Sequence, residues 1–387
     1  MTDTSLALVE RLIAFDTTSR GSNLALIDFA QELLEAAGAR CRRTYDPGRA
    51  KANLFATIGP SEKGGREEGG YVLSGHTDVV PVDGQDWSSD PFAPETRDGK
   101  MFGRGTADMK GFIGTALSLL PEIAQAKLKR PIHFALSYDE EVGCAGVSAL
   151  LDDLKANGIR PALALVGEPT DMKVVGAHKG GAVIHTRCHG REGHSSAPDK
   201  GANAVMMAGA FVAYLKELSD SVKHHRDAHF DPPYTTVQAN MISGGTAVNV
   251  LARDATVTWE YRNLPDRDGK AILDAARHHA EHEILPRYRL TVPEAGIDTE
   301  LKAAYPGLVL DPDSPAIALA REISGANSVE TVAYGTEAGL FQRAGIPSVI
   351  CGPGSIEQAH KADEFVALSQ LAACERFLRK LIARACV

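Results

Sequence analysis

The sequence predicts an α/β fold, in which a mainly parallel sheet is covered by helices and a smaller α+β lid or dimerisation domain is inserted. Three observations support this prediction. Short, nearly continuous apolar segments alternate with helical patterns in the first third of the chain, as expected of strands buried on both faces. Near residue 178 the segments instead alternate between apolar and polar residues, and after about residue 290 the first pattern returns.

The first and last parts of the chain are expected to form one domain. Helical spacing of apolar residues covers residues 5–13 and 24–37, and Gly38 stands where a helix commonly ends. The apolar strand candidates are residues 53–58, 71–74, 132–138 and 162–166, with helical stretches at 111–126 and 145–157. We therefore expect the domain to comprise residues 1–177 and 291–387.

The inserted domain is expected to cover residues 178–290. It contains a strand at 182–188, a loop rich in Gly, Ser and Pro at 190–200, and a long helix at 203–218. Two strands with period-two alternation follow at 235–242 and 255–261, before a helix at 270–284. This pattern predicts an antiparallel sheet with one polar face.

Composition narrows the class of protein. The 387 residues include 41 Lys and Arg against 50 Asp and Glu, a formal net charge of −9, which argues against a nucleic-acid partner. No run approaches the roughly 18 apolar residues of a membrane helix. The N-terminus lacks the basic segment of a signal peptide, and the six cysteines form no C-x-x-C pair. We expect a cytoplasmic protein without disulfides, membrane contacts or a cysteine zinc site.

Five segments place His, Asp or Glu beside glycine or proline, four of them at or just after a predicted strand. They are SGHTD (74–78), GTADMKG (105–111), YDEE (138–141), GEP (167–169) and QAH (358–360). Ligands of open α/β sheets bind beyond the carboxyl ends of the strands. A single such residue is usually explained by a turn or a helix cap. Five together predict a metal site with nitrogen and oxygen ligands, for which zinc is the first expectation.

Seven motifs, in order along nearly the whole chain, carry a resemblance to a known family. They are GHTDVVP (75–81), GRGTADMKG (103–111), SYDEEVG (137–143), GEPT (167–170), GREGHSSAP (190–198), GGTAVNV (244–250) and GPGSIEQAHKADEFV (352–366). Together they resemble the dinuclear-zinc amidohydrolases, the family of aminoacylases, acetylornithine deacetylases and succinyl-diaminopimelate desuccinylases. The resemblance implies two divalent metal ions, Zn²⁺ first and Co²⁺ second.

The resemblance also implies the ligands and the general base. Asp108 would bridge the two ions. His76 and Glu168 would complete one site, and Glu141 and His360 would complete the other. Glu140 would be the general base. Asp78 lies two residues after His76, on the same side of an extended segment, and would orient its imidazole.

Two further sets of residues are implied to contact the substrate. His194 would stabilise the oxyanion in the site of a partner subunit; the alternative is a turn histidine bonded to Ser195 or Ser196. Arg262 would clamp a carboxylate, or else is an exposed arginine at a strand end. The remaining expected contacts are Asn249, Thr336, Glu337, Gly352 and Gly354. We expect Glu337 either to bind a cationic substrate amine or to be a carboxylate at a helix N-terminus, whereas Gly352 and Gly354 let backbone amides approach an anion.

The expected function is metal-dependent hydrolysis of a small N-acyl amino acid by a homodimer. Segments at 177–181, 335–341 and 352–360 look most similar to those of the acetylornithine deacetylases of this family. That resemblance implies N2-acetyl-L-ornithine as the substrate, giving L-ornithine and acetate in arginine biosynthesis. Alternative substrates are N-succinyl-diaminopimelate, N-acetylcitrulline and general N-acyl amino acids. A catalytically inactive binding protein of the same fold is disfavoured because every ligand position and the base position are filled.

Overall fold

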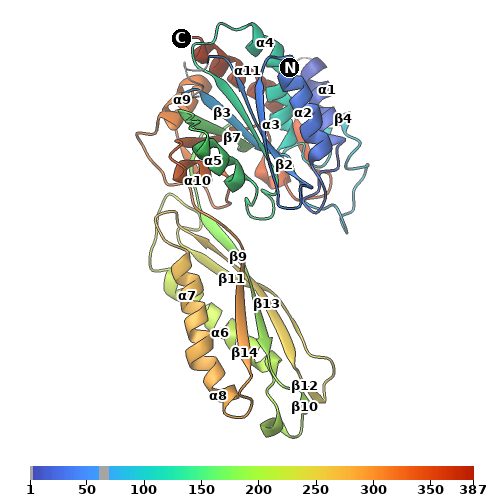
Figure 1. The fold of residues 1–387 in the computed structure, drawn as a ribbon, viewed down its shortest axis with the longest axis vertical. Helices are drawn as coiled ribbons and strands as arrows, with labels where there is room; N and C mark the ends of the chain where they lie inside the picture. The colour runs from blue at the N-terminus through green and yellow to red at the C-terminus, as the bar shows by residue number, and fades with distance from the viewer. Residues whose placement is uncertain (1–2, 61–68) are drawn as a thin grey trace. The chain divides into compact units, whose positions relative to one another are not determined.

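A computed structural model describes residues 3–60 and 69–387, and the chain divides into two compact units (Figure 1). The first unit comprises Met1–Ala177, Leu308–Thr331 and Thr336–Val387. The second comprises His178–Gly307 and Val332–Gly335. Each unit has its own hydrophobic core.

An eight-stranded sheet forms the centre of the first unit. Its strands lie in the order β1 (Arg40–Tyr45), β2 (Ala52–Ile58), β6 (Ile132–Ser137), β3 (Tyr71–His76), β7 (Leu163–Pro169), β16 (Ser348–Gly352), β8 (Val175–His178) and β15 (Glu330–Val332). The four central strands β6, β3, β7 and β16 are mutually parallel. Strand β2 pairs antiparallel with β6, β8 pairs antiparallel with β16, and β1 pairs antiparallel with β2. The predicted α/β fold with a mainly parallel sheet is confirmed.

Helices cover both faces of this sheet (Figure 1). Those sharing the main core are α1 (Asp3–Ile13), α2 (Leu24–Ala36), α3 (Lys110–Ser118), α4 (Leu120–Gln125), α9 (Pro315–Ser324) and α11 (Leu368–Ala385). Leu54 and Ala56 of β2 belong to this core, whereas Phe55, which points to the opposite face, does not. There α5 (Val147–Ala156) contacts β1 and β2, and α10 (Ala338–Arg343) contacts β7 and β16. The central strands are apolar throughout because both faces are covered.

A small sheet lies beside the main one in the first unit. It contains β4 (Glu95–Arg97), β5 (Lys100–Phe102) and β17 (Phe365–Ala367), paired antiparallel. Strand β17 follows the segment that carries His360, and the segment after β5 leads to Asp108. The pairing of β5 with β17 therefore joins two stretches that both carry predicted ligands.

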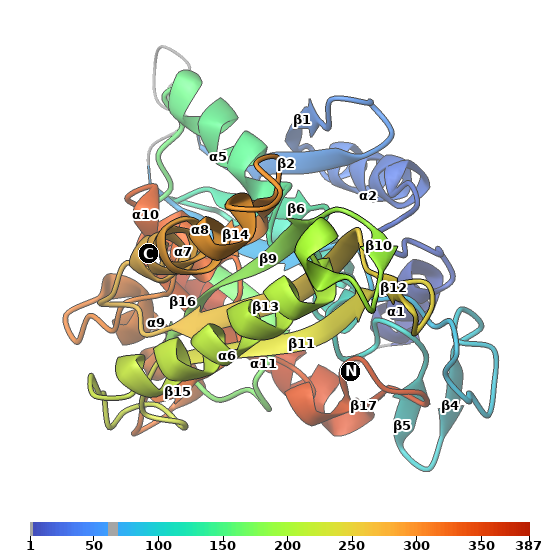
Figure 2. The ribbon, with the colours of Figure 1, turned by 90° about the horizontal axis from the view of Figure 1, so that it is seen from below.

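The second unit is a four-stranded antiparallel sheet with helices. Its strands lie in the order β11 (Thr236–Gly244), β13 (Asp254–Asn263), β9 (Gly180–His189) and β14 (Gly296–Tyr305). Helix α6 (Ala204–Val222) runs across one face of this sheet (Figure 2), and Phe211 packs on the buried Trp259 of β13. The other elements are α7 (Lys270–His279), α8 (Leu285–Arg289), β10 (Gly193–His194) and β12 (Val250–Leu251).

The inserted unit extends further along the chain than expected. The sequence placed its end at residue 290, but β14 pairs with β9 and carries the unit to Gly307. Strand β14 has no apolar alternation, because it is an edge strand whose residues are mostly exposed or half-buried. A central strand such as β13 alternates between buried and partly exposed residues and was therefore visible in the sequence.

Two further expectations concern disulfide bonds and membrane-spanning helices. All six cysteines are free. Over residues 3–60 and 69–387, no helix combines the length and apolar character needed to cross a membrane.

Candidate metal centre

The predicted metal ligands come from one edge of the main sheet. His76 ends β3 and Glu168 lies near the end of β7, while Glu141 follows β6 after a turn. Asp108 stands just before α3, and His360 follows β16. Because β3, β6, β7 and β16 run parallel, the segments beyond their carboxyl ends meet at the same edge.

The five side chains form two groups that share Asp108. In the first group His76 Nε2 lies 2.9 Å from Asp108 Oδ1 and 3.7 Å from Glu168 Oε1. In the second group His360 Nε2 lies 3.4 Å from Asp108 Oδ2 and 3.0 Å from Glu141 Oε2. Within each group the three potential ligand atoms all lie within 4.8 Å of one another. Asp108 therefore presents one carboxylate oxygen to each group.

Exposure differs sharply between the two histidines. The His76 side chain is 1% exposed, whereas that of His360 is 55% exposed. The carboxylates of Asp108, Glu141 and Glu168 are 5–7% exposed. The centre is thus enclosed by protein on the His76 side, and solvent reaches it at His360.

Burial and neighbouring charge raise the pKa of the two glutamates of the centre, whereas hydrogen bonds from His360 and His76 lower the pKa of Asp108. Burial, followed by repulsion from Asp108, raises the pKa of Glu141 to about 7 and that of Glu168 well above its usual range. Buried carboxylates gathered with two imidazoles are the donor set that divalent cations such as zinc accept. The residues therefore fit a pair of metal ions, whose positive charge would offset the repulsion.

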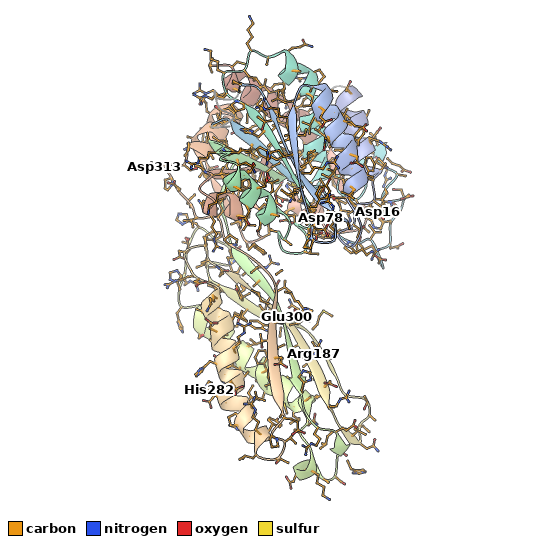
Figure 3. All side chains as sticks on the ribbon, in the orientation of Figure 1. Asp16, Asp78, Arg187, His282, Glu300 and Asp313 are labelled. Atoms are coloured by element: carbon orange, nitrogen blue, oxygen red, sulfur yellow. The ribbon has the colours of Figure 1, made fainter. Side chains whose placement is uncertain are left out.

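Asp78 lies two residues beyond the end of β3 (Figure 3), but the hydrogen bonds of its carboxylate are made with residues other than His76. His76 Nδ1 lies 2.9 Å from the backbone carbonyl of Asp78 and 3.7 Å from its Oδ1. The carboxylate instead accepts hydrogen bonds from the backbone N–H groups of Glu140 and Glu141, at 3.1 and 3.2 Å, and from the Ser19 hydroxyl at 2.7 Å. In this structure Asp78 therefore orients the His76 ring through its main chain and fixes the Glu140–Glu141 turn through its side chain.

Glu140 and Glu141 separate because the chain turns between β6 and α5. Asp139 has a positive φ of 57°, and the backbone N–H groups of Gly143 and Cys144 donate to the carbonyl of Glu140 at 2.9 and 2.8 Å. Glu140 belongs to neither ligand group. The Cys144 thiol donates to its Oε1 at 3.3 Å, and burial raises the pKa of Glu140 well above its usual range. A carboxylate that is left out of the ligand groups yet stands beside them is available for proton transfer.

The expected substrate contacts of the first unit have partners within the protein. Thr336 Oγ1 accepts from the Ala338 N–H, and the Gly352 N–H donates to Thr170 Oγ1 at 3.2 Å. A Cβ at Gly352 would lie 2.0 Å from the Gly167 carbonyl, so glycine is needed for strand packing. Gly354 has a φ of 86°, and its carbonyl oxygen accepts a hydrogen bond from the backbone N–H of Asp171. Roles of these residues in anion binding stay predictions.

Glu337 lies in the interior of the first unit. Its side chain accepts from Ser74 Oγ at 3.5 Å, and within the described residues Oε1 has no hydrogen-bond partner. Burial raises its pKa to about 7. Glu337 directly precedes α10, as the helix-terminus alternative expects, and it is 1% exposed. Contact with a substrate amine would require the side chain to become accessible, so that role also stays a prediction.

The remaining predicted residues belong to the second unit. His194 is exposed in β10, and its Nδ1 lies 2.7 Å from Ser196 Oγ, a contact expected of a turn histidine. The carbonyl of the exposed Asn249 accepts the Ser195 N–H, which links the two loops. Arg262 donates to Glu260 at 3.1 Å and to the Tyr305 hydroxyl. These contacts leave the catalytic role of His194 and the substrate-binding roles of Asn249 and Arg262 as predictions.

Two buried charged residues next to the centre were missed in the sequence. Arg104 and Glu364 form an ion pair at 2.7 Å, and both side chains are 1% exposed. Each stands inside a motif that the sequence analysis used, GRGTADMKG and QAHKADEFV. The sequence offered one signal for this pair: both residues are charged and stand inside a family motif, yet neither had been assigned a role in binding metal or substrate.

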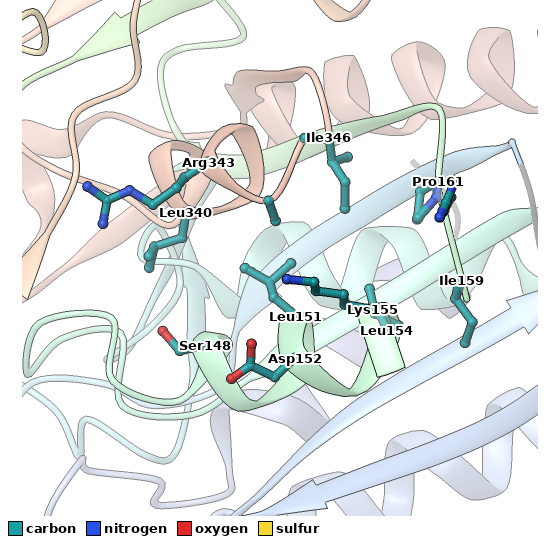
Figure 4. Close-up of a pocket in the computed structure, with 13 residues that line it drawn as sticks. Ser148, Leu151, Asp152, Leu154, Lys155, Ile159, Pro161, Leu340, Arg343 and Ile346 are labelled. Carbon is teal, nitrogen blue, oxygen red and sulfur yellow. The ribbon is translucent and has the colours of Figure 1, made fainter. Parts of the chain in front are cut away.

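A cavity of about 530 Å³ lies elsewhere in the first unit, between α5 and α10 (Figure 4). Apolar side chains such as Leu151, Leu154 and Leu340 line it together with Lys155 and Arg343. No residue of the two ligand groups, nor Glu140, is among its lining residues. This cavity is therefore separate from the metal centre.

The family model described as Peptidase family M20/M25/M40 matches residues 72–384, which include all five predicted ligands. The chain belongs to this family. It is therefore a metallo-hydrolase, and the resemblance carried by the seven motifs is confirmed. Among M20 relatives, the acetylornithine deacetylase of Myxococcus xanthus is 36% identical over 399 residues, covering 100% of this chain and 99% of the relative. That of Photorhabdus laumondii is 34% identical, covering 97% and 94%.

Solved structures with similar folds are more distant in sequence. Human carnosine dipeptidase 1 has a TM-score of 0.74 at 15% identity, covering 99% of this chain and 97% of that one. The M20 family metallo-carboxypeptidase Sso-CP2 of Sulfolobus solfataricus has a TM-score of 0.75 at 14% identity, covering 98% and 99%. At these identities the likeness supports the fold, including both units, and carries no information on the substrate.

Proposed function

We propose that this chain hydrolyses the amide bond of small N-acyl amino acids and that N2-acetyl-L-ornithine is its substrate. The products would be L-ornithine and acetate, a step of arginine biosynthesis, in the reducing cytoplasm that suits six free cysteines. The hydrolytic chemistry is supported by one observation: the two carboxylate oxygens of Asp108 face different ligand groups. The choice of substrate rests on the relatives named acetylornithine deacetylase at 33–36% identity.

Two divalent cations, Zn²⁺ or Co²⁺, would be held by the two groups. His76, Asp108 and Glu168 would bind one cation, and Asp108, Glu141 and His360 would bind the other. A pair of such cations supplies a water of lowered pKa and polarises the scissile carbonyl. Imidazole and carboxylate ligands are compatible with either metal.

Glu140 would act as the general base. Its carboxylate takes a proton from the attacking water, and the same proton then passes to the nitrogen of the leaving amino acid as the amide C–N bond breaks. Asp78 supports this role because it holds the backbone N–H groups of both Glu140 and Glu141. The turn therefore keeps one glutamate for metal binding and its neighbour for proton transfer.

A panel of substrates with defined metals tests the proposal. We expect the zinc or cobalt enzyme to hydrolyse N2-acetyl-L-ornithine with the highest kcat/KM, and a chelator to abolish the activity. Higher kcat/KM for N-succinyl-diaminopimelate, N-acetylcitrulline or N-acetylmethionine would replace the substrate assignment and keep the chemistry. Absence of chelator-sensitive hydrolysis on every substrate would instead support a catalytically inactive binding protein.

We also propose that the protein is a homodimer joined through the second unit. Strand β11 forms an edge of its sheet, and from Ala239 to Gly244 its residues are exposed. Met241 and Ile242 are 68% and 58% exposed, and Met206 of the adjacent α6 is 63% exposed. An unpaired edge strand with exposed apolar side chains favours antiparallel pairing with a second copy.

Complementation between two inactive variants tests both the dimer and His194. His194→Ala keeps the metal ligands and Glu140, whereas Glu140→Ala keeps His194. If His194 acts in the partner's site, a mixed dimer contains one complete site, and random assembly restores about a quarter of wild-type activity. Co-expression with two different tags yields the mixture, and kcat and metal content are measured for each species.

Each outcome of that experiment separates the alternatives. Two inactive homodimers with an equally inactive mixed dimer would mean that His194 acts within its own chain. Full activity of His194→Ala alone would reduce His194 to the turn residue that its Ser196 contact describes. A monomer in sedimentation analysis would overturn the dimer.

A further inference from the structure

Glu364 holds the loop that carries the shared ligand. Its carboxylate accepts three backbone hydrogen bonds, from Gly105 at 3.0 Å, Ala107 at 2.9 Å and Asp108 at 3.1 Å. The side chain is 1% exposed, so these bonds are shielded from water. One buried carboxylate therefore fixes the main chain of residues 105–108, which form a loop rather than a helix or strand.

Arg104 and Gln85 extend the same contacts to the loop that carries His360. Arg104 donates to Glu364 Oε2 at 2.7 Å, to the Lys361 carbonyl at 3.3 Å, and to the Gln85 side chain. Gln85 Nε2 in turn donates to the carbonyl of His360 at 2.9 Å. His360 has a positive φ of 64°, a conformation that is uncommon for residues other than glycine.

We propose that Gln85, Arg104 and Glu364, here called the loop clamp, are positioning residues that set the distance between Asp108 and His360 for metal binding. The proposal rests on the two-metal centre proposed above. A buried ion pair adds little net stability compared with apolar residues of the same size. The clamp pair instead bonds the main chain at one metal ligand, Asp108, and next to another, His360, which a purely structural pair would not need to do.

The clamp contacts the two loops unequally, and this makes the proposal specific. Glu364 acts on the loop of Asp108, which belongs to both ligand groups. Gln85 bonds the main chain of His360, which belongs to the second group alone. Loss of Glu364 should therefore weaken the binding of both metal ions, and loss of Gln85 should weaken the binding of one.

Zinc titration of the metal-free protein against a chromophoric chelator tests the clamp. We expect Glu364→Gln to lower the affinity for both zinc ions about 10–100-fold, the range typical of residues that support metal ligands. Gln85→Ala should weaken one ion and leave the other unchanged. Glu375→Gln is the matched control, because Glu375 is also 1% exposed and pairs with Arg379 at 2.7 Å on α11. It should leave both zinc affinities at the wild-type value.

Thermal unfolding of the metal-free proteins separates positioning from stability. A merely structural clamp would lower the Tm of Glu364→Gln and Glu375→Gln alike and leave the zinc affinities unchanged, which would overturn the proposal. If Glu364→Gln does not fold, Gln85→Ala decides, since Gln85 is only half-buried; unchanged affinity for both ions would then overturn the clamp. A wild-type protein that binds fewer than two zinc ions would overturn the two-metal centre and the clamp with it.

Discussion

Glu140→Ala is expected to bind two zinc ions as tightly as the wild type and to lose about 10²–10⁴-fold in kcat, the usual contribution of a general base. The expectation follows from geometry. Glu140 is absent from both ligand groups, while its neighbour Glu141 lies 3.0 Å from His360 Nε2 in the second group. Removing the Glu140 side chain should therefore leave the ligands in place and remove only the group that moves the proton.

Metal content and kcat must be measured on the same preparation. Glu141→Ala is the control, because its loss should reduce the bound zinc from two ions to one. The backbone contacts of Asp78 with residues 140 and 141 persist in both variants, so the turn itself is retained. If Glu140→Ala loses an ion and Glu141→Ala does not, the assignments of ligand and base to these two residues are reversed.

The grouping of the five candidate ligands could be predicted because each lies at or near a strong local signal. His76 and Glu168 follow uninterrupted apolar segments, which become the central strands β3 and β7. Parallel neighbours bring their carboxyl ends to one edge whatever the details of packing. The resemblance carried by the motifs placed Glu141 and not Glu140 among the candidate ligands, a distinction that periodicity alone does not make and that the ligand groups of the structure share.

Contacts between distant parts of the chain had no such signal. Glu364 meets Arg104 and the Asp108 loop across 256–260 residues of sequence, and only the folded chain brings them together. The Asp78 carboxylate was expected at His76 because residues two positions apart in an extended segment lie on the same side, yet its hydrogen bonds reach residues 140 and 141. Strand β14 was missed for a different reason, since an exposed edge strand needs no apolar pattern.

Asp108→Asn is expected to release both metal ions and to abolish hydrolysis. An ionised aspartate offers two acceptor oxygens, and here Oδ1 faces His76 while Oδ2 faces His360. The asparagine amide keeps one oxygen and replaces the other with an NH₂ donor, which repels a cation. Cations that polarise a carbonyl contribute several kcal/mol to transition-state stabilisation, so kcat/KM should fall by about 10³-fold or more.

The comparison with Glu168→Gln makes the shared role of Asp108 measurable. Glu168 belongs to the first group alone. Its substitution should therefore lower the affinity for one zinc ion in a titration and leave the affinity for the other at the wild-type value. Glu364 bonds the backbone N–H of residue 108 rather than its side chain, so the loop stays anchored in Asp108→Asn and any loss of metal reports the carboxylate itself. One zinc ion retained at wild-type affinity by Asp108→Asn would mean that the two groups do not depend on a common ligand.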